Sequence, residues 1–213
     1  MTIRSIWWAG IVLVVAQGCA DGGQGSPLAV TPPLAYLTLP ESSLTFLRPA
    51  AGAPPLARRQ VSFWAVNGQT REGVILYQKR PGQPAASKLV RLKVDKRSLV
   101  NRSDGTPIAP GDSILITMTV VDTLRLIVDF QPQGLLFAPS RPARITFWYL
   151  EADHDFNFDG VVDAADVALE SSFEVWGQEL PGDPWSNLVS FPQPGSDQVE
   201  ARVPGFTRYA VSY

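Results

Sequence analysis

The stretch from Asp155 to Asp166 brings oxygen-bearing residues together at nearly every second position. Its oxygen donors are the side chains of Asp155, Asn157, Asp159, Asp163 and Asp166 and the backbone carbonyl of Val161. Calcium takes about six to eight oxygen ligands of these kinds, and Gly160 permits the sharp turn that closes such a shell. Carboxylates packed this closely repel one another unless a cation neutralises them. The stretch predicts a calcium-binding loop, with an aspartate-rich solvated turn as the alternative.

This spacing resembles the EF-hand loop, and more closely its dockerin variant, D-x-N-x-D-G-x-V-D-x-x-D, in which the last ligand is Asp rather than Glu. The resemblance covers the loop and the short helix expected after it. It implies calcium as the cofactor. Dockerins carry two such loop–helix units and bind a cohesin partner, whereas this chain has one unit. The resemblance therefore does not extend to cohesin binding.

The first residues have the pattern of an export signal. Arg4 supplies a positive charge, and the apolar run over residues 6–16 is too short to cross a bilayer core of about 30 Å. The run ends in Ala-Gln-Gly-Cys19, which resembles the cleavage site of bacterial lipoproteins. We expect residues 1–18 to be a signal peptide and Cys19, the only cysteine, to carry lipid. The alternative is an ordinary secretory peptide with a leftover cysteine.

Residues 19–35 are expected to be the lipidated cysteine followed by a flexible tether, because Gly, Ser and Pro dominate them and cannot build a core. Fully extended, residues 20–33 reach at most about 46 Å. By resemblance to envelope lipoproteins, Ala20 directly after the cysteine favours the outer membrane. We therefore expect an exported protein of the cell envelope that contacts the membrane through its N-terminal lipid.

Residues 36–213 are expected to form one β-sandwich domain. The chain is 45% hydrophobic and 18% charged with a net charge of −2, a balance that argues against a nucleic-acid partner. Its 19 prolines and 17 glycines punctuate short alternating segments, which is typical of an all-β fold. The expected strands are residues 60–66, 73–78, 89–94, 113–121, 124–130, 143–150, 173–178, 185–190, 198–203 and 207–213.

Two of these segments carry further expectations. Asp122 and Thr123 lie between adjoining strand patterns and are expected to form a tight hairpin. Residues 143–150 are apolar on both faces, so their strand should be central in its sheet.

One helix is expected, inside an insertion at residues 151–172. Residues 163–170 are good helix formers, and Ala164, Val167 and Ala168 share one face at helical spacing. Asp163 at the helix start would favour the helix dipole. The fold class is therefore all-β, a β-sandwich with one short helix after an inserted calcium-binding loop.

Scattered motifs over residues 60–213 resemble the ZU-five type of β-sandwich, which occurs in ankyrins, netrin receptors and exported bacterial lipoproteins. They are the strand at 89–94, the Asp104-Gly105 and Gly111-Asp112 turns, the Pro-Gln-Gly-Leu-Leu-Phe segment at 132–137, Pro142-Ala143 and the ending at 205–211. The resemblance implies the fold and says little about function.

Some of these relatives cleave themselves at a His-Phe-Ser ending, and this chain has Gly205-Phe206-Thr207 in that place. Such cleavage needs a base beside the hydroxyl. With no histidine there, we expect a structural last strand, with Tyr209 and Val211 facing inward.

No catalytic constellation is evident elsewhere in the sequence. The only histidine, His154, has no second His or free Cys with it and is expected to be a solvated loop residue. Trp64, Trp148, Trp176 and Trp185 are expected to be mostly core, the alternative being a sugar-binding platform.

We therefore expect a non-catalytic, lipid-anchored envelope protein with a structural calcium site, whose partner is an envelope protein or a glycan. The alternatives are a carbohydrate- or protein-binding module that uses surface tryptophans, or an envelope hydrolase with an acidic pocket away from residues 155–166.

Overall fold

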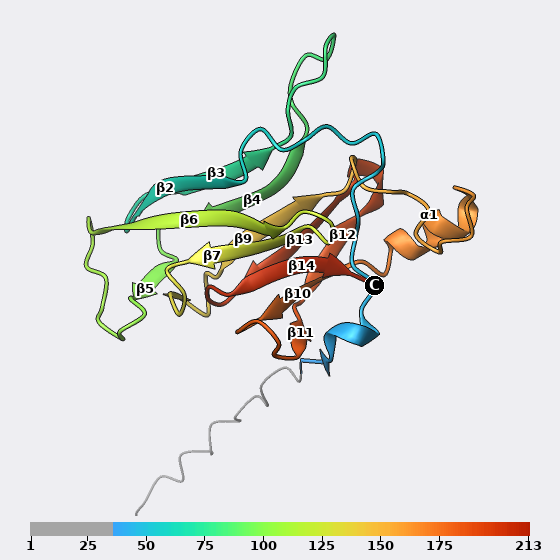
Figure 1. Ribbon diagram of the computed structural model, residues 1–213. Helices are drawn as coiled ribbons and strands as arrows, with labels where there is room; N and C mark the ends of the chain where they lie inside the picture. Colours follow the sequence, from blue (N-terminus) through green and yellow to red (C-terminus); the bar gives the residue numbers. More distant parts are fainter. Residues whose placement is uncertain (1–35) are drawn as a thin grey trace, which may run out of the picture. The chain divides into compact units, whose positions relative to one another are not determined.

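A computed structural model describes the chain from Tyr36 to Tyr213, so the expected signal peptide (1–18) and the expected lipidated cysteine and tether (19–35) lie outside the described residues. The described residues form two antiparallel sheets packed face to face, with one short α-helix at one end (Figure 1). The all-β fold expected from the alternating patterns is confirmed.

The larger sheet has seven strands in the order β1-β11-β10-β14-β7-β6-β2, and the smaller has five in the order β12-β13-β9-β4-β3. A separate ribbon pairs β5 with β8. The elements are β1 (Thr38–Leu39), β2 (Gln60–Val66), β3 (Arg71–Leu76), β4 (Lys88–Val94), β5 (Leu99–Asn101), β6 (Ser113–Asp122), β7 (Ile127–Gln131), β8 (Leu136–Phe137), β9 (Ala143–Trp148), α1 (Ala164–Glu170), β10 (Glu174–Gln178), β11 (Trp185–Asn187), β12 (Ser190–Gln193), β13 (Gln198–Val203) and β14 (Arg208–Ser212), with 3-10 turns η1 (Glu41–Ser43) and η2 (Pro194–Ser196).

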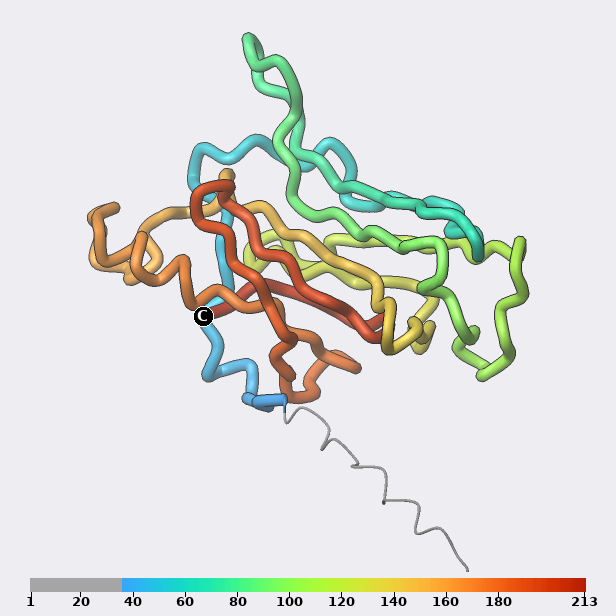
Figure 2. Tube along the Cα trace, turned by 180° about the vertical axis from the view of Figure 1, so that it is seen from behind, coloured from blue at the N-terminus to red at the C-terminus, as the bar shows by residue number. Residues whose placement is uncertain are grey.

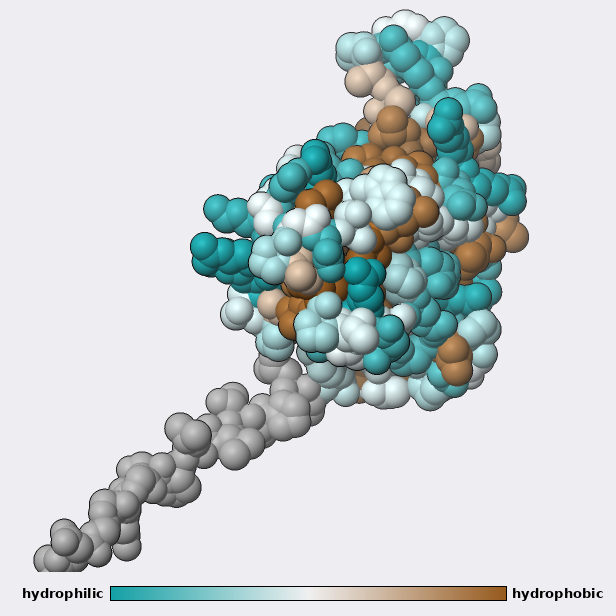
Figure 3. Space-filling view, turned by 90° about the vertical axis from the view of Figure 1, so that its left-hand side faces the viewer, coloured by the Kyte–Doolittle hydropathy of each residue, from teal (hydrophilic) through white to brown (hydrophobic). Residues whose placement is uncertain are grey.

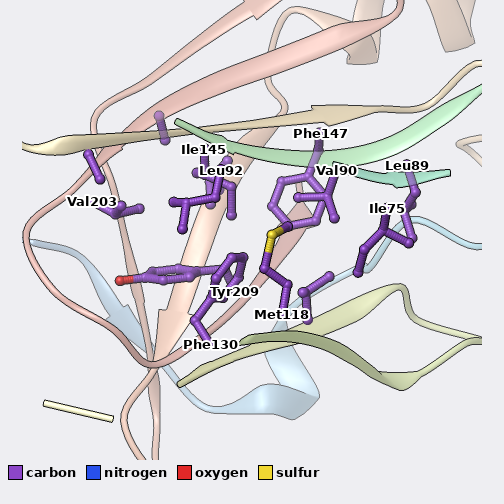
Figure 4. Close-up of a cluster of buried hydrophobic side chains, with 14 of the residues drawn as sticks. Ile75, Leu89, Val90, Leu92, Met118, Phe130, Ile145, Phe147, Val203 and Tyr209 are labelled. Carbon is purple, nitrogen blue, oxygen red and sulfur yellow. The ribbon is translucent and has the colours of Figure 1, made fainter. Parts of the chain in front are cut away.

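The core lies between the two sheets. In Figure 4, Val90, Leu92 and Phe147 of the five-stranded sheet point toward Met118 and Phe130 of the seven-stranded sheet. Strand β9 lies in the middle of its sheet, as its two apolar faces predicted. Seen from the left-hand side of Figure 1, the surface is mostly hydrophilic with small hydrophobic patches (Figure 3). Alternation along the strands therefore sends most large apolar side chains inward.

The expected tight hairpin at Asp122 and Thr123 is wrong in its bounds. Strands β6 and β7 do pair, but β7 begins only at Ile127, opposite Asp122. The Asp122 carboxylate accepts hydrogen bonds from the backbone N–H groups of Leu124 (2.8 Å) and Arg125 (3.0 Å). Because an aspartate side chain can cap a turn in this way, the connection is longer than the hydrophobic pattern indicated.

A second, smaller core lies on the outer face of the seven-stranded sheet. Trp176, Trp185, Ile127 and Ala210 form it together with Phe46 from the segment that precedes β2. The Trp185 indole donates a hydrogen bond to Glu41, whose carboxylate also pairs with Arg125. The chain before β2 therefore covers part of this sheet. Strand β14 is consequently buried on both faces, with Tyr209 and Val211 facing the main core as expected.

Strands β10 and β14 approach closely where Gly177 lies opposite Tyr209. A methyl group built on Gly177 would lie 2.9 Å from Cε1 of the Tyr209 ring. That ring is buried, and its hydroxyl donates to the carbonyl of Gly205 (2.6 Å). Because the ring is held at both ends, glycine at 177 is a packing requirement rather than a source of flexibility.

We expect Gly177→Ala to lower the free energy of unfolding by about 1–3 kcal/mol, because the added methyl group overpacks a buried ring. Gly195→Ala is the matched control, since a methyl group there meets nothing within 4 Å, and it should change stability by less than about 0.5 kcal/mol. Urea denaturation of both variants measures the difference. Equal stability of the two would show that the Tyr209 ring moves aside freely.

Candidate metal centre

The acidic loop lies between β9 and β10 at one end of the sandwich, beside the C-terminus (Figure 2). Strand β9 ends at Trp148, α1 follows the loop, and β10 returns the chain to the sheet at Glu174. The helix expected at residues 163–170 corresponds to α1 (Ala164–Glu170). The loop and α1 therefore connect strands of the two different sheets.

The first half of the loop is organised by side-chain oxygens that accept backbone N–H groups. Asp155 accepts from Asp159 (3.1 Å) and Gly160 (2.9 Å). The side-chain oxygen of Asn157 also accepts from Asp159 (2.9 Å), and Asp159 in turn accepts from Val161 (2.9 Å). Gly160 has a φ of +87°, which lets the chain reverse without strain. The side chains of Asp155, Asn157 and Asp159 thus turn toward the inside of one curl of backbone.

The second half is closed by Asp166. Its carboxylate accepts from the N–H groups of Phe156 (2.7 Å), Asn157 (3.1 Å) and Asp163 (2.9 Å), so it joins the start of the loop to the start of α1. Asp163 is the helix N-cap and accepts from Ala165 (2.7 Å). These hydrogen bonds, of which the one from the Asp163 N–H has the largest effect, hold the pKa of Asp166 below its usual range. Burial of the carboxylate acts in the opposite direction and is outweighed.

Phe156 anchors the loop in the main core. Its ring lies 4.9 Å from that of Phe173, 6.0 Å from Tyr213 and 6.3 Å from Tyr149, all three edge-to-face. The Tyr213 hydroxyl donates to the Phe156 carbonyl. His154 also packs on Phe156, at 5.3 Å, so it is half-buried rather than fully solvated. The second residue of the loop is therefore fixed by both its side chain and its backbone.

The helix faces the sandwich with a different side from the one its apolar residues suggested. Ala164, Val167 and Ala168 are exposed, whereas Asp166 and Glu170 are buried. Asp166 is needed for the loop bonds, and Glu170 accepts a hydrogen bond of 2.9 Å from the Tyr149 hydroxyl. Because these polar contacts outweigh the burial of three small side chains, they decide how α1 is rotated.

The donor set of the loop fits a calcium ion. Carboxylate, amide and carbonyl oxygens are its preferred ligands, and each carboxylate oxygen that accepts one N–H group keeps a further lone pair. All six predicted ligands lie in this one loop: Asp155, Asn157, Asp159, Val161, Asp163 and Asp166. As the side chains stand, no group of three or more His, Cys, Asp or Glu in residues 36–213 converges as metal ligands do. Calcium binding therefore stays a prediction.

A third buried carboxylate, Glu151, has a structural role. It pairs with Arg80 at 2.7 Å and accepts from the Ser87 hydroxyl at 2.7 Å, which fastens the protruding β3–β4 hairpin to the end of β9. The three residues line a surface hollow of about 370 Å³. Arg80 and Ser87 therefore fix the position of this carboxylate at the rim of the hollow.

The tryptophans divide between core and surface. Trp176 and Trp185 are buried, Trp148 is half-buried on the outer face of the five-stranded sheet, and Trp64 is 58% exposed on β2. Trp64 lies opposite Leu115, which is 45% exposed. In the part of the chain that the structure describes, no two tryptophan rings are in contact. A surface site would therefore rest on Trp64 alone rather than on a tryptophan pair.

Comparisons with protein-family models, with curated proteins and with solved structures found no match. The helices among residues 36–213 are all too short or too polar to cross a membrane.

Self-cleavage before Thr207 is expected to be absent, because its hydroxyl donates to the Gln178 carbonyl and no imidazole is near it among the described residues. A side chain at Gly205 would also press on the Leu135 carbonyl, 3.0 Å from the added carbon. The purified mature protein should keep its full length during long incubation at neutral pH, as judged by intact mass. A fragment that begins at Thr207 would contradict this.

Proposed function

We propose that this protein is a lipid-anchored component of the bacterial cell envelope whose β-sandwich is stabilised by one calcium ion. It acts without catalysis, by binding or by a structural role. The observation that carries the proposal is the loop at residues 155–166, where Asp155, Asn157 and Asp159 turn into one curl of backbone that is fixed to the core through Phe156.

Calcium would neutralise carboxylates that otherwise repel one another. Asp159 and Asp163 are exposed and Asp155 is half-buried, and they share the loop with the buried Asp166. No ion pair to Lys or Arg offsets these four charges among the described residues. With one cysteine in the chain, no internal disulfide is available to fix the insertion. A bound calcium ion would hold the loop in place, and its role would be structural rather than catalytic.

The rest of the proposal rests on the N-terminal sequence and on the ZU-five resemblance. The Ala-Gln-Gly-Cys19 segment supports lipid attachment, and Ala20 supports an outer-membrane position. The Pro-Gln-Gly-Leu-Leu-Phe segment at 132–137 supports a ZU-five-like domain by its resemblance in sequence. These resemblances concern architecture and place in the cell, so the partner is an envelope protein or a glycan.

One observation keeps a second function in view, that of a carbohydrate- or protein-binding module. Trp64 presents its ring to solvent, and on the same face the Ser62 hydroxyl is hydrogen-bonded to that of Thr117 (2.8 Å). An exposed aromatic ring beside hydroxyl groups is suited to a sugar ring or to a partner's aromatic side chain. Loss of glycan binding in Trp64→Ala, with calcium binding intact, would favour this function.

Calcium should stabilise the folded protein if it binds the loop only when the chain is folded. A dissociation constant on the order of 20 μM lies between those of sensor loops and of extracellular modules. At roughly 2 mM calcium the stabilisation is then about 2.7 kcal/mol. For a domain of this size the melting temperature should rise by about 5–10 °C. Thermal melts with calcium, with magnesium and with a chelator measure the shift, and magnesium should substitute poorly.

Asp155→Ala and Asp159→Ala should abolish the calcium shift, because each removes a ligand carboxylate. Asp153→Ala is the matched control, since it removes a carboxylate two residues before the loop and should keep most of the shift. If the melting temperature is the same with calcium, with magnesium and with a chelator, and the purified protein contains no calcium, the loop is only an acidic turn and not a calcium site.

Cys19→Ser should release the protein from membranes, because one residue carries the whole lipid attachment. The measurement is the distribution between membrane pellet and soluble fraction after a high-salt wash, which removes charge-driven contacts. A variant that remains in the washed pellet with unchanged detergent partitioning would disprove the anchor.

A further inference from the structure

The outer face of the five-stranded sheet gathers basic residues that are far apart in the sequence. Directly opposite residues on paired antiparallel strands point to the same side of a sheet. Arg202 of β13 lies opposite Arg144 of β9, and Arg144 lies opposite Lys93 of β4. With neighbouring strands about 4.8 Å apart, this row of three cations spans about 10 Å. Arg91, two residues from Lys93 on β4, belongs to the same face.

Lys88 extends this group at the start of β4, where its ammonium lies 4.9 Å from the ring centre of Trp148. The guanidinium of Arg91 lies 5.4 Å from the same ring. We call Lys88, Arg91, Lys93, Arg144 and Arg202 the cationic face.

These cations are only partly balanced by the protein. Arg144 pairs with Asp95 at 3.2 Å, and the other four make no ion pair within the described residues. Arg91 gives one N–H to the Thr146 hydroxyl, and its Nε is left without an acceptor. Two acids, Glu72 and Glu200, share the face by strand register. Five cations against three carboxylates leave it positive, on a chain whose net charge is −2.

Like charges directly opposite one another destabilise a sheet. The row through Arg202, Arg144 and Lys93 places three of them side by side. Asp95 pairs with Arg144, and Glu72 lies opposite Lys93 at the end of the row, so Arg202 has no acid directly opposite it. Folding alone does not favour Arg202 directly beside Arg144. An external array of anions would relieve the repulsion, so the row is better explained by a partner than by stability.

The shape of the cationic face indicates which kind of partner it could bind. Four surface hollows are formed by the described residues, and none of them is lined by a residue of the cationic face. A sheet face with dispersed cations suits a surface that presents many anions rather than a single bound anion. Phe191 is 44% exposed on the edge strand β12, and the Arg202 guanidinium lies 5.8 Å from its ring centre. Aromatic rings among basic residues are typical of proteins that lie on lipid headgroups.

We propose that the cationic face docks the domain onto an anionic phospholipid surface. This inference rests on the proposed function, since a lipid on Cys19 would keep the domain within about 46 Å of a membrane by its tether. A tethered surface meets its partner at high effective concentration, so the weak binding that the untethered domain shows by itself would be strengthened in the anchored protein. The domain would then lie flat on the membrane, with the seven-stranded sheet and Trp64 facing away from it.

The test uses the purified mature chain with Cys19→Ser, which has no lipid of its own. It should sediment with vesicles of phosphatidylcholine and phosphatidylglycerol in equal parts, not with phosphatidylcholine alone, and high salt should release it. Each Lys or Arg near an anionic surface contributes about five-fold in partitioning. Lys93→Gln with Arg202→Gln should therefore weaken binding by roughly 30-fold.

The matched control is Arg58→Gln with Arg59→Gln, two exposed residues that precede β2 of the other sheet. It makes the same change in net charge and should weaken binding by less than about three-fold. If the double variant melts at a lower temperature than the parent protein, Lys93→Gln alone is used instead, and it should still weaken vesicle binding by about five-fold. Equal weakening in the control would overturn the proposal, as would absence of vesicle binding. Capture by soluble polygalacturonate without binding to vesicles would overturn it in favour of an acidic glycan.

Failure of this experiment is distinct from failure of the proposed function. Vesicle binding is measured without the lipid anchor, while release of Cys19→Ser from salt-washed cell membranes tests the anchor without the cationic face.

Discussion

The seating of Phe156 in the main core is the contact on which the whole candidate site depends. Its ring packs against Phe173 and Tyr213, and its backbone is held at one end by Asp166 and at the other by the Tyr213 hydroxyl. An aspartate-rich loop cannot bury itself, because unpaired carboxylates are costly to remove from water. One aromatic residue within the acidic stretch solves this problem, since it carries the loop into the core while the carboxylates stay at the surface.

This contact also links the loop to the last strand of the sandwich. Tyr213 ends the described chain directly after β14, which lies in the middle of the seven-stranded sheet and is buried on both faces. Burial, together with nearby carboxylates of the loop, raises the pKa of Tyr213 to about 12, so its hydroxyl stays a donor to Phe156 at physiological pH. Order in the loop and order at the end of β14 are therefore coupled through a few rings and one hydrogen bond.

Much of the fold followed from the alternation of apolar residues. The expected segments 60–66 and 198–203 coincide with β2 and β13, and the two apolar faces of residues 143–150 correctly placed β9 at the centre of its sheet. The short helix after the aspartate-rich stretch was also located, because Asp and Gly at fixed spacing determine local backbone turns. These features depend on neighbours along the chain, which a sequence displays directly.

What the sequence could not show depends on contacts between distant residues. The rotation of α1 is determined by Glu170 meeting Tyr149 and by Asp166 meeting Phe156, and the apolar spacing of the helix pointed to another face. Strands β5 and β8 are too short to carry a periodic pattern. The cationic face escaped notice because Arg91, Arg144 and Arg202 lie on three different strands, and only the register of the sheet brings them together.

The central claim is that calcium holds the loop, and through Phe156 the end of the last strand, in a single arrangement. Amide hydrogen exchange of the mature chain, with calcium and with a chelator, tests it most directly. The account predicts that calcium slows exchange of the amide protons of Phe156, Gly160 and Tyr213 by up to about 100-fold, equivalent to about 2.7 kcal/mol. Amides of β4, at the far side of the core, should change less if the loop opens locally. Identical exchange of these three amides in both solutions would contradict the account.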